Sequence, residues 1–225
     1  MPLTKRDAAV AVGVGLFVLA GRKAMAGTGK QTVKTAPPKL DPNADGANLL
    51  KRANQKSATA WASIFADHPV SPLVAQALAR WAGIESSGNA TAKSRLDERG
   101  LLQVGAQTVG EGGTSAAEWA ALVSPSTTKK QHAAIAVKYA DWLARQASTY
   151  VRPFTVDPVD MIWYAKLWHQ RPVDVRDVVG PTATEVGTPA AQVVARALAI
   201  KWAGDPKAMH RLRAANVIAF GTPTP

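Results

Sequence analysis

The sequence predicts an all-α domain, on the basis of its composition and its helix-start signals. Hydrophobic residues make up 47% of the 225 positions, and alanine-rich text without alternation of β-branched residues favours helices. Five dipeptides place a Ser, Thr or Asp before a proline, which is typical of helix N-termini: Ser71-Pro72, Ser124-Pro125, Asp157-Pro158, Thr188-Pro189 and Asp205-Pro206. Apolar residues with helical spacing follow these pairs, so we expect about six to eight helices in one domain over residues 49–225.

Residues 1–26 are predicted to be a membrane anchor or a signal segment. The uncharged apolar run 8–21 lies between Lys5-Arg6 and Arg22-Lys23, and it is shorter than the ~20 residues that span a bilayer comfortably. The basic flanks favour a short retained anchor, whereas Ala24-Met25-Ala26 favours cleavage as a signal peptide. A buried N-terminal helix is the third interpretation. Membrane association through residues 8–21 would place the body outside the cytoplasm or at a membrane.

Residues 27–48 are predicted to be a flexible linker before the domain. They are rich in Gly, Thr, Lys, Pro and Asn, and include Pro37-Pro38 and Asp41-Pro42, a composition that does not form a packed core. Beyond the linker, residues 49–225 form the predicted domain, in which the C-terminal helices expected over 189–220 have no assigned role. No internal repeat is visible in the sequence.

Charge and composition restrict the partners and the chemistry. The net charge of +11 and the pI of about 10.1 indicate an anionic partner such as nucleic acid, acidic lipid or cell-wall polymer. We do not expect nucleic-acid binding, because the basic residues are dispersed and no nucleic-acid-binding motif is present. The absence of cysteine excludes disulfides and thiolate chemistry. The four histidines lack metal-site spacing, so no metal and no other cofactor is expected.

Glu85 is the leading candidate for a catalytic residue. The helix expected after Ser71-Pro72 carries an apolar stripe of Val74, Leu78 and Trp81. The next step of four residues along this stripe reaches Glu85. This helix is expected to end at residues 86–89, with Gly88 as a left-handed cap. The helix dipole and apolar neighbours would then favour the protonated carboxyl that a general acid needs. Periodicity alone favours the plainer alternative, in which Glu85 points to solvent.

The residues that follow Glu85 form a spaced motif over 24 positions: Glu85, Ser86, Ala92, Ser94, Gly100, Leu101, Gln103 and Thr108. In spacing and residue type this motif resembles the soluble lytic transglycosylase family of lysozyme-like folds. The resemblance covers roughly residues 60–170. The chain departs from the family pattern at Gly88, where the family has an aromatic residue, at Asp97-Glu98, where it has Gly-Ala, and at Leu102, where it commonly has Met.

The resemblance implies cleavage of peptidoglycan glycan strands by a single carboxyl group. Glu85 would protonate the oxygen between N-acetylmuramic acid and N-acetylglucosamine, and would then deprotonate the C6 hydroxyl, giving a 1,6-anhydro product. Ser94 would hydrogen-bond sugar substituents beside the scissile bond, and Gln103 would orient sugar or backbone in the cleft. Tyr164, in the segment Met161–Lys166, would hold and polarise Glu85; its alternative interpretation is an ordinary core aromatic residue.

Two other functions remain open at this stage. A hydrolytic muramidase would use a second carboxylate to activate water, with Asp97 or Glu98 as candidates, although an acidic loop pair is more often simply solvated. A structural component of a virion or secretion apparatus would keep the same fold only to bind peptidoglycan. The expected location is the periplasm or a membrane in a bacterium, or the virion if a phage encodes the chain.

The seven tryptophans allow both core and sugar-stacking roles. Five lie at apolar helical positions and are expected in the core: Trp61, Trp81, Trp119, Trp142 and Trp202. Trp163 and Trp168 lie near Tyr164, so we expect these two to line a groove for glycan.

Overall fold

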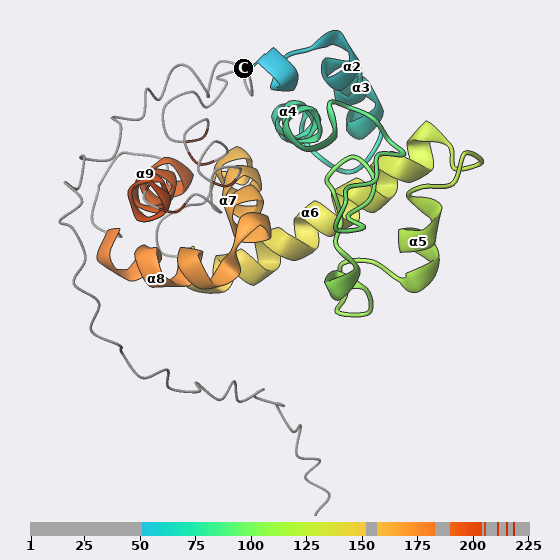
Figure 1. Ribbon diagram of the computed structural model, residues 1–225. Helices are drawn as coiled ribbons and strands as arrows, with labels where there is room; N and C mark the ends of the chain where they lie inside the picture. Colours follow the sequence, from blue (N-terminus) through green and yellow to red (C-terminus); the bar gives the residue numbers. More distant parts are fainter. Residues whose placement is uncertain are drawn as a thin grey trace, which may run out of the picture. The chain divides into compact units, whose positions relative to one another are not determined.

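The computed structural model in Figure 1 describes residues 51–151, 157–182 and 190–203, together with 205, 211, 215 and 218. The predicted anchor or signal segment and the linker lie outside this part of the chain. Within it the fold is helical, as predicted, and its extended segments form isolated bridges rather than strands. No helix among these residues has the length and apolar character needed to cross a bilayer.

Eight α-helices and one 3₁₀ turn have bounds within the described part, and residues 51–53 are helical as well. In chain order they are α2 (Lys56–Thr59), α3 (Trp61–Ala66), α4 (Pro72–Ser86), η1 (Ala106–Thr108), α5 (Ala116–Ala121), α6 (Lys129–Val151), α7 (Pro158–Gln170), α8 (Pro172–Thr182) and α9 (Ala190–Trp202). The long helix α6 packs against α3 and α7, while α4 packs between α3 and α7. Their apolar faces form one core, in which Trp81, Tyr139 and Tyr164 are fully buried.

Two of the predicted helix starts are confirmed in detail. Ser71 accepts a hydrogen bond from the backbone N–H of Val74 at 3.3 Å, and α4 begins at the following proline. Asp157 accepts one from the backbone N–H of Val159 at 2.8 Å, and α7 begins at Pro158. Both side chains satisfy a donor that the first helical turn leaves without a partner.

The predicted helix start at Ser124-Pro125 is wrong, because the helix that follows it, α6, begins at Lys129. Thr128 and Gln131 form a capping box there. The Thr128 hydroxyl accepts from the Gln131 N–H at 3.2 Å, and the Gln131 side chain accepts from the Thr128 N–H at 2.8 Å. Ser124 instead caps a turn, in which it accepts from the N–H of Ser126. The other two pairs, at 188–189 and 205–206, lie wholly or partly outside the described residues.

Helix α4 ends at Ser86, within the predicted range 86–89, and Gly88 is left-handed as predicted. Ser87, rather than Gly88, is the first left-handed residue, with φ of 58°, and Gly88 follows with φ of 75°. The N–H of Gly88 bonds to the carbonyl of Ala82, which closes a left-handed cap. Two side chains from the N-terminal segment hold Ser87, since Arg52 donates to its hydroxyl at 3.0 Å and Ser57 to its carbonyl at 2.9 Å.

Close backbone packing holds the last turns of α4 against residues 52–58. A Cβ atom on Gly83 would lie 2.6 Å from the carbonyl oxygen of Arg52, and one on Gly88 would lie 2.7 Å from the carbonyl oxygen of Ser57. Real Cβ atoms do not approach so closely, so only glycine permits this contact. The two glycines are on either side of Glu85 in the chain, and the packing therefore determines where Glu85 is placed.

Gly83→Ala is expected to destabilise the protein, although alanine is the better helix former. We expect the substitution to lower the free energy of unfolding by about 1–3 kcal/mol, because the added methyl group must displace backbone. Denaturant unfolding measures this change. Gln76→Ala in the same helix is the matched control, and should stay within about 0.5 kcal/mol. A stabilised Gly83→Ala variant would contradict the close packing.

Candidate active site

Glu85 lies in the last turn of α4, and its side chain is 5% exposed. The three apolar residues that precede it on the stripe are buried, as the periodicity predicts: Val74, Leu78 and Trp81. The prediction that Glu85 continues the buried face is therefore confirmed, and the alternative that it points to solvent is wrong. A carboxyl group is held in the interior at the end of a helix.

Three polar side chains of α7 surround this carboxyl group, which corrects the expectation of apolar neighbours. Lys166, itself fully buried, forms an ion pair with Oε1 of Glu85. Gln170 donates to the same oxygen at 3.3 Å, and Nε2 of His169 is 3.9 Å from it. These residues share one face of α7 because their positions are three and four apart. The ammonium of Lys166 favours the ionised carboxylate, whereas burial opposes it.

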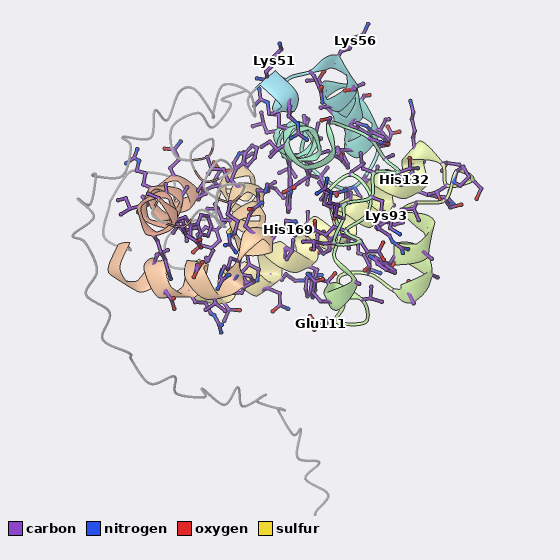
Figure 2. All side chains as sticks on the ribbon, viewed as in Figure 1. Lys51, Lys56, Lys93, Glu111, His132 and His169 are labelled. Atoms are coloured by element: carbon purple, nitrogen blue, oxygen red, sulfur yellow. The ribbon has the colours of Figure 1, made fainter. Side chains whose placement is uncertain are left out.

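Tyr139 of α6 connects to this group through His169, which is labelled in Figure 2. The Tyr139 hydroxyl and Nδ1 of His169 are 2.9 Å apart. Burial raises the pKa of Tyr139, and the negative charges of Glu85 and Glu98 raise it further, while a hydrogen bond with Thr108 opposes the change. The hydroxyl therefore keeps its proton at neutral pH and is available as a hydrogen-bond donor.

Aromatic rings hold His169 in place. Its ring centroid is 5.8 Å from that of Tyr139 in an edge-on arrangement, and 5.9 Å from that of Trp81. Trp142 stacks on the other side of Tyr139, with ring centroids 5.9 Å apart. A ring enclosed in this way has few orientations open to it, so the distance from His169 to Glu85 is set by packing.

The loop that carries the spaced motif is held together by the motif residues themselves. The N–H of Gly100 donates to the carbonyl of Ala92 at 2.8 Å, and the Gln103 side chain donates to the carbonyl of Gly100 at 2.9 Å. Gln103 is 6% exposed and has a left-handed backbone with φ of 53°. The structure therefore places Gln103, predicted to bind substrate, inside the loop as a structural residue.

Ser94, the second predicted substrate-binding residue, also supports the loop. Its hydroxyl donates to the Glu98 carboxylate at 3.0 Å and accepts from the N–H groups of Leu96 and Glu98. Ser94 therefore uses most of its hydrogen-bonding capacity within its own turn.

Asp97 in the same turn adopts a left-handed backbone with φ of 59°. The glycine of the family pattern would adopt this conformation without strain.

The two candidate second carboxylates point to different surroundings. Asp97 is bound by the Arg99 guanidinium at 3.0 Å and by the Lys93 ammonium at 2.9 Å, and these hydrogen bonds lower the pKa of the exposed carboxyl. Glu98 acts electrostatically on Tyr139, which Glu85 also influences. Of the two residues, Glu98 is thus the one that influences Tyr139.

The predicted contact between Tyr164 and Glu85 is not formed. Tyr164 is fully buried, and its hydroxyl has no hydrogen-bond partner within the described structure. It lies two positions from Lys166 on α7, a rotation of about 200°, so the two side chains leave opposite faces of the helix. The tyrosine connected to Glu85, through His169, is instead Tyr139, which belongs to the apolar stripe of α6 and carries no distinguishing sequence signal.

The expected groove tryptophans belong to the core. Trp163 and Trp168 are 3% and 8% exposed. Two tryptophans expected in the core are half-buried instead: Trp142 stacks on Tyr139, and Trp119 lies under the guanidinium of Arg99 at 3.4 Å from its ring centroid. The aromatic surface near the motif loop therefore comes from α5 and α6, and not from α7.

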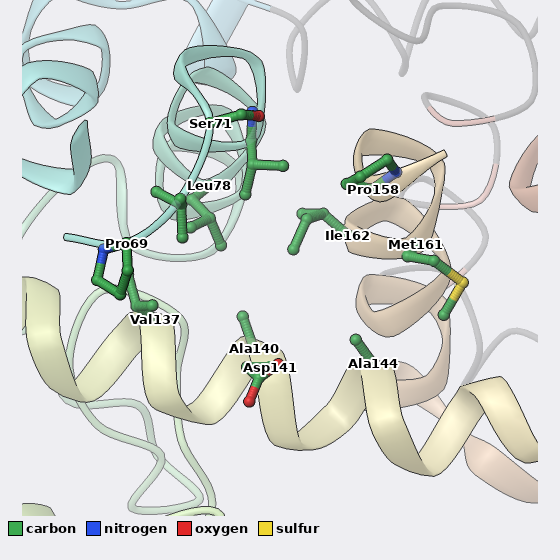
Figure 3. Close-up of a pocket in the computed structure, with 12 residues that line it drawn as sticks. Pro69, Ser71, Leu78, Val137, Ala140, Asp141, Ala144, Pro158, Met161 and Ile162 are labelled. Carbon is green, nitrogen blue, oxygen red and sulfur yellow. The ribbon is translucent and has the colours of Figure 1, made fainter. Parts of the chain in front are cut away.

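A separate apolar cavity of about 320 Å³ lies between α4, α6 and α7, as Figure 3 shows. Its walls include Leu78, Val137 and Ile162, and Ser71 stands at its edge. Ser71 and Glu85 are at opposite ends of α4, about 20 Å apart along a straight helix. The cavity is therefore distinct from the surroundings of Glu85.

The Glu85–Lys166 pair is expected to show strong energetic coupling. Lys166→Met leaves a buried carboxylate without its cation, and Glu85→Gln leaves a buried ammonium, so each should destabilise the protein by about 3–5 kcal/mol. The double variant removes both charges and should be less destabilised than the sum of the two. Denaturant unfolding of all four proteins measures the coupling, and additive effects would mean that the pair is separated in solution.

No protein-family model matches the chain, and neither does any curated protein or solved structure. Two features of the chain's own residues bear on its function. One is the spaced motif that closes the loop after α4, and the other is the set of polar side chains around the buried carboxyl of Glu85.

Proposed function

We propose that the chain is a lytic transglycosylase of lysozyme-like fold. It cleaves the β-1,4 bond between N-acetylmuramic acid and N-acetylglucosamine in peptidoglycan, with Glu85 as general acid and then general base. The observation that carries this proposal is the nearly buried Glu85 carboxyl at the end of α4, which Lys166 and His169 of α7 approach. Buried ionisable groups with specific charged partners concentrate at functional sites.

The contacts of Glu85 suit a group that takes part in two proton transfers. Lys166, His169 and Gln170 all approach the same oxygen, Oε1, which fixes the orientation of the carboxyl group. When Glu85 donates its proton to the bridging sugar oxygen, negative charge develops on the carboxylate. The ammonium of Lys166 stabilises this charge as it forms, which lowers the barrier of the first step.

The second step needs the carboxylate as a base. The C6 hydroxyl of the muramic sugar loses its proton to Glu85 and attacks C1, so that an anhydro ring forms and no water is consumed. Glu85 then carries a proton again, and the next cycle begins from the acid form. A bridging sugar oxygen that accepts a hydrogen bond from Glu85 favours this protonated form.

A hydrolytic muramidase is the second candidate, and one observation favours a particular residue for it. Glu98 interacts electrostatically with Tyr139, next to Glu85, whereas Asp97 is neutralised by Lys93 and Arg99. Glu98 is therefore the carboxylate that would activate water. In this mechanism the product carries a reducing end instead of an anhydro end.

A non-catalytic peptidoglycan-binding component of a virion or secretion apparatus is the third candidate. The complete burial of Lys166 favours this candidate, because a buried ion pair can have a purely structural role in the packing of two helices. The net charge of +11 suits an anionic wall polymer in all three cases. The proposed location is the periplasm or a membrane, reached through residues 8–21, or the virion.

Zymography and product analysis test the catalytic role of Glu85. The wild-type chain should clear purified peptidoglycan, and Glu85→Gln should lose at least about a hundredfold in rate, because it removes both proton transfers. The Glu85→Gln/Lys166→Met double variant keeps the packing neutral and should be equally inactive. Equal clearing by wild type and both variants would overturn the assignment. No clearing by any folded protein would favour the binding component.

The chemical form of the product ends separates transglycosylation from hydrolysis. We expect anhydro ends, which weigh one water less than reducing ends in mass spectrometry, from wild type and from Asp97→Asn and Glu98→Gln alike. Reducing ends that disappear in Glu98→Gln but persist in Asp97→Asn would instead identify Glu98 as the base of a hydrolase. The Asp97 variant is the matched control from the same loop.

A further inference from the structure

His169 connects two oxygens that can carry a proton. On one side, Nδ1 is hydrogen-bonded to the hydroxyl of Tyr139 at 2.9 Å; on the other, Nε2 is 3.9 Å from Oε1 of Glu85. The side chain is 10% exposed and is enclosed by the rings of Trp81 and Tyr139. Each ring nitrogen thus faces one defined partner across the packing of α4, α6 and α7.

The hydroxyl of Tyr139 can donate its proton to either of two partners, His169 or Thr108. The hydroxyl of Thr108 donates to the carbonyl of Gly105 at 2.8 Å, so the Thr108 oxygen can accept a hydrogen bond from Tyr139. If Tyr139 donates to Nδ1 of His169, the imidazole proton is on Nε2 and faces Glu85. If Tyr139 donates to Thr108, its oxygen accepts from Nδ1–H, and His169 can hold a second proton on Nε2 as imidazolium.

We propose that His169, oriented by Tyr139, protonates Glu85 when the carboxylate rests ionised beside Lys166 in the free protein. This inference rests on the proposed function, which needs the acid form of Glu85 when substrate binds; during turnover the C6 hydroxyl returns the proton that Glu85 has given up. In the step, the Nε2–H bond of the imidazolium breaks and an O–H bond forms on the Glu85 carboxylate, which leaves a neutral imidazole and a carboxylic acid. Because packing holds the His169 ring, a movement of about 1 Å by the Glu85 side chain brings the two atoms from 3.9 Å to hydrogen-bond distance.

The positive charge of Lys166 acts on both groups that exchange this proton. Lys166, on the same helix as His169, repels the imidazolium and so favours release of its proton. The same ammonium favours ionised Glu85 when the sugar oxygen takes the proton. Glu98 interacts electrostatically with Tyr139, the hydrogen-bond partner of His169.

A titration of the full chain by ¹⁵N NMR tests the connection between His169 and Glu85 directly. Comparison with the spectrum of His169→Gln identifies the His169 ring resonances among those of the four histidines. Glu85→Gln should lower the midpoint of His169 by about one pH unit, because it removes the negative partner. Tyr139→Phe should change the balance of its two neutral tautomers. An unchanged midpoint in Glu85→Gln would overturn the inference even if the chain cleaves peptidoglycan.

The pH dependence of cleavage is the second test. The wild-type rate should fall as pH rises through the range in which imidazoles lose their proton, about pH 6–7. His169→Gln should abolish this pH limb and lower the rate about tenfold or more in protein that thermal unfolding shows to be folded. Tyr139→Phe should move the limb, and His68→Gln, a half-buried histidine at the end of α3, should preserve it.

The two proposals fail in different ways. A folded wild-type chain that never cleaves peptidoglycan would contradict the proposed function, and the NMR titration would still decide whether His169 and Glu85 share a proton. An active wild type whose pH profile survives both His169→Gln and Tyr139→Phe would contradict the inference alone, and would leave the pair a purely structural contact.

Discussion

The buried ion pair between Glu85 and Lys166 is the interaction on which the rest of the site depends. Both side chains are removed from water, so neither charge can remain without the other unless its protonation changes. The pair therefore determines the register of α7 against the end of α4. That register in turn brings His169 and Gln170, one turn further along α7, to the same carboxyl oxygen.

A second constraint acts from the opposite side of α4. The segment 52–58 packs on Gly83 and Gly88 at distances that admit no side chain, and it hydrogen-bonds to Ser87 between them. The end of a helix is ordinarily its least rigid part, but here it is held by both neighbours. This rigidity is what a catalytic carboxyl needs, since small displacements of a reacting group reduce the rate strongly.

The arrangement also resolves a conflict between the two roles proposed for Glu85. A permanent positive charge beside a carboxyl favours the base and opposes the acid, so Glu85 in the free protein needs a proton donor beside it before the first turnover. His169 has the right place for it, and Tyr139 is hydrogen-bonded to the ring nitrogen on the side away from Glu85. Lys166 and His169 thus supply the two opposite tendencies that a single carboxyl group must combine.

The sequence by itself determined the all-helical class and the starts of α4 and α7, because capping and helical periodicity act within a few residues. It placed Glu85 in line with the apolar stripe of α4, but only the packing of α7 decided that its side chain is buried. It also located the motif loop, although not what its residues do. Only the tertiary structure decided that Lys166 and Tyr139 surround Glu85, that Tyr164 does not, and that Ser94 and Gln103 bond within their own loop. These contacts join residues far apart in the chain, and they depend on which faces the packed helices present to one another.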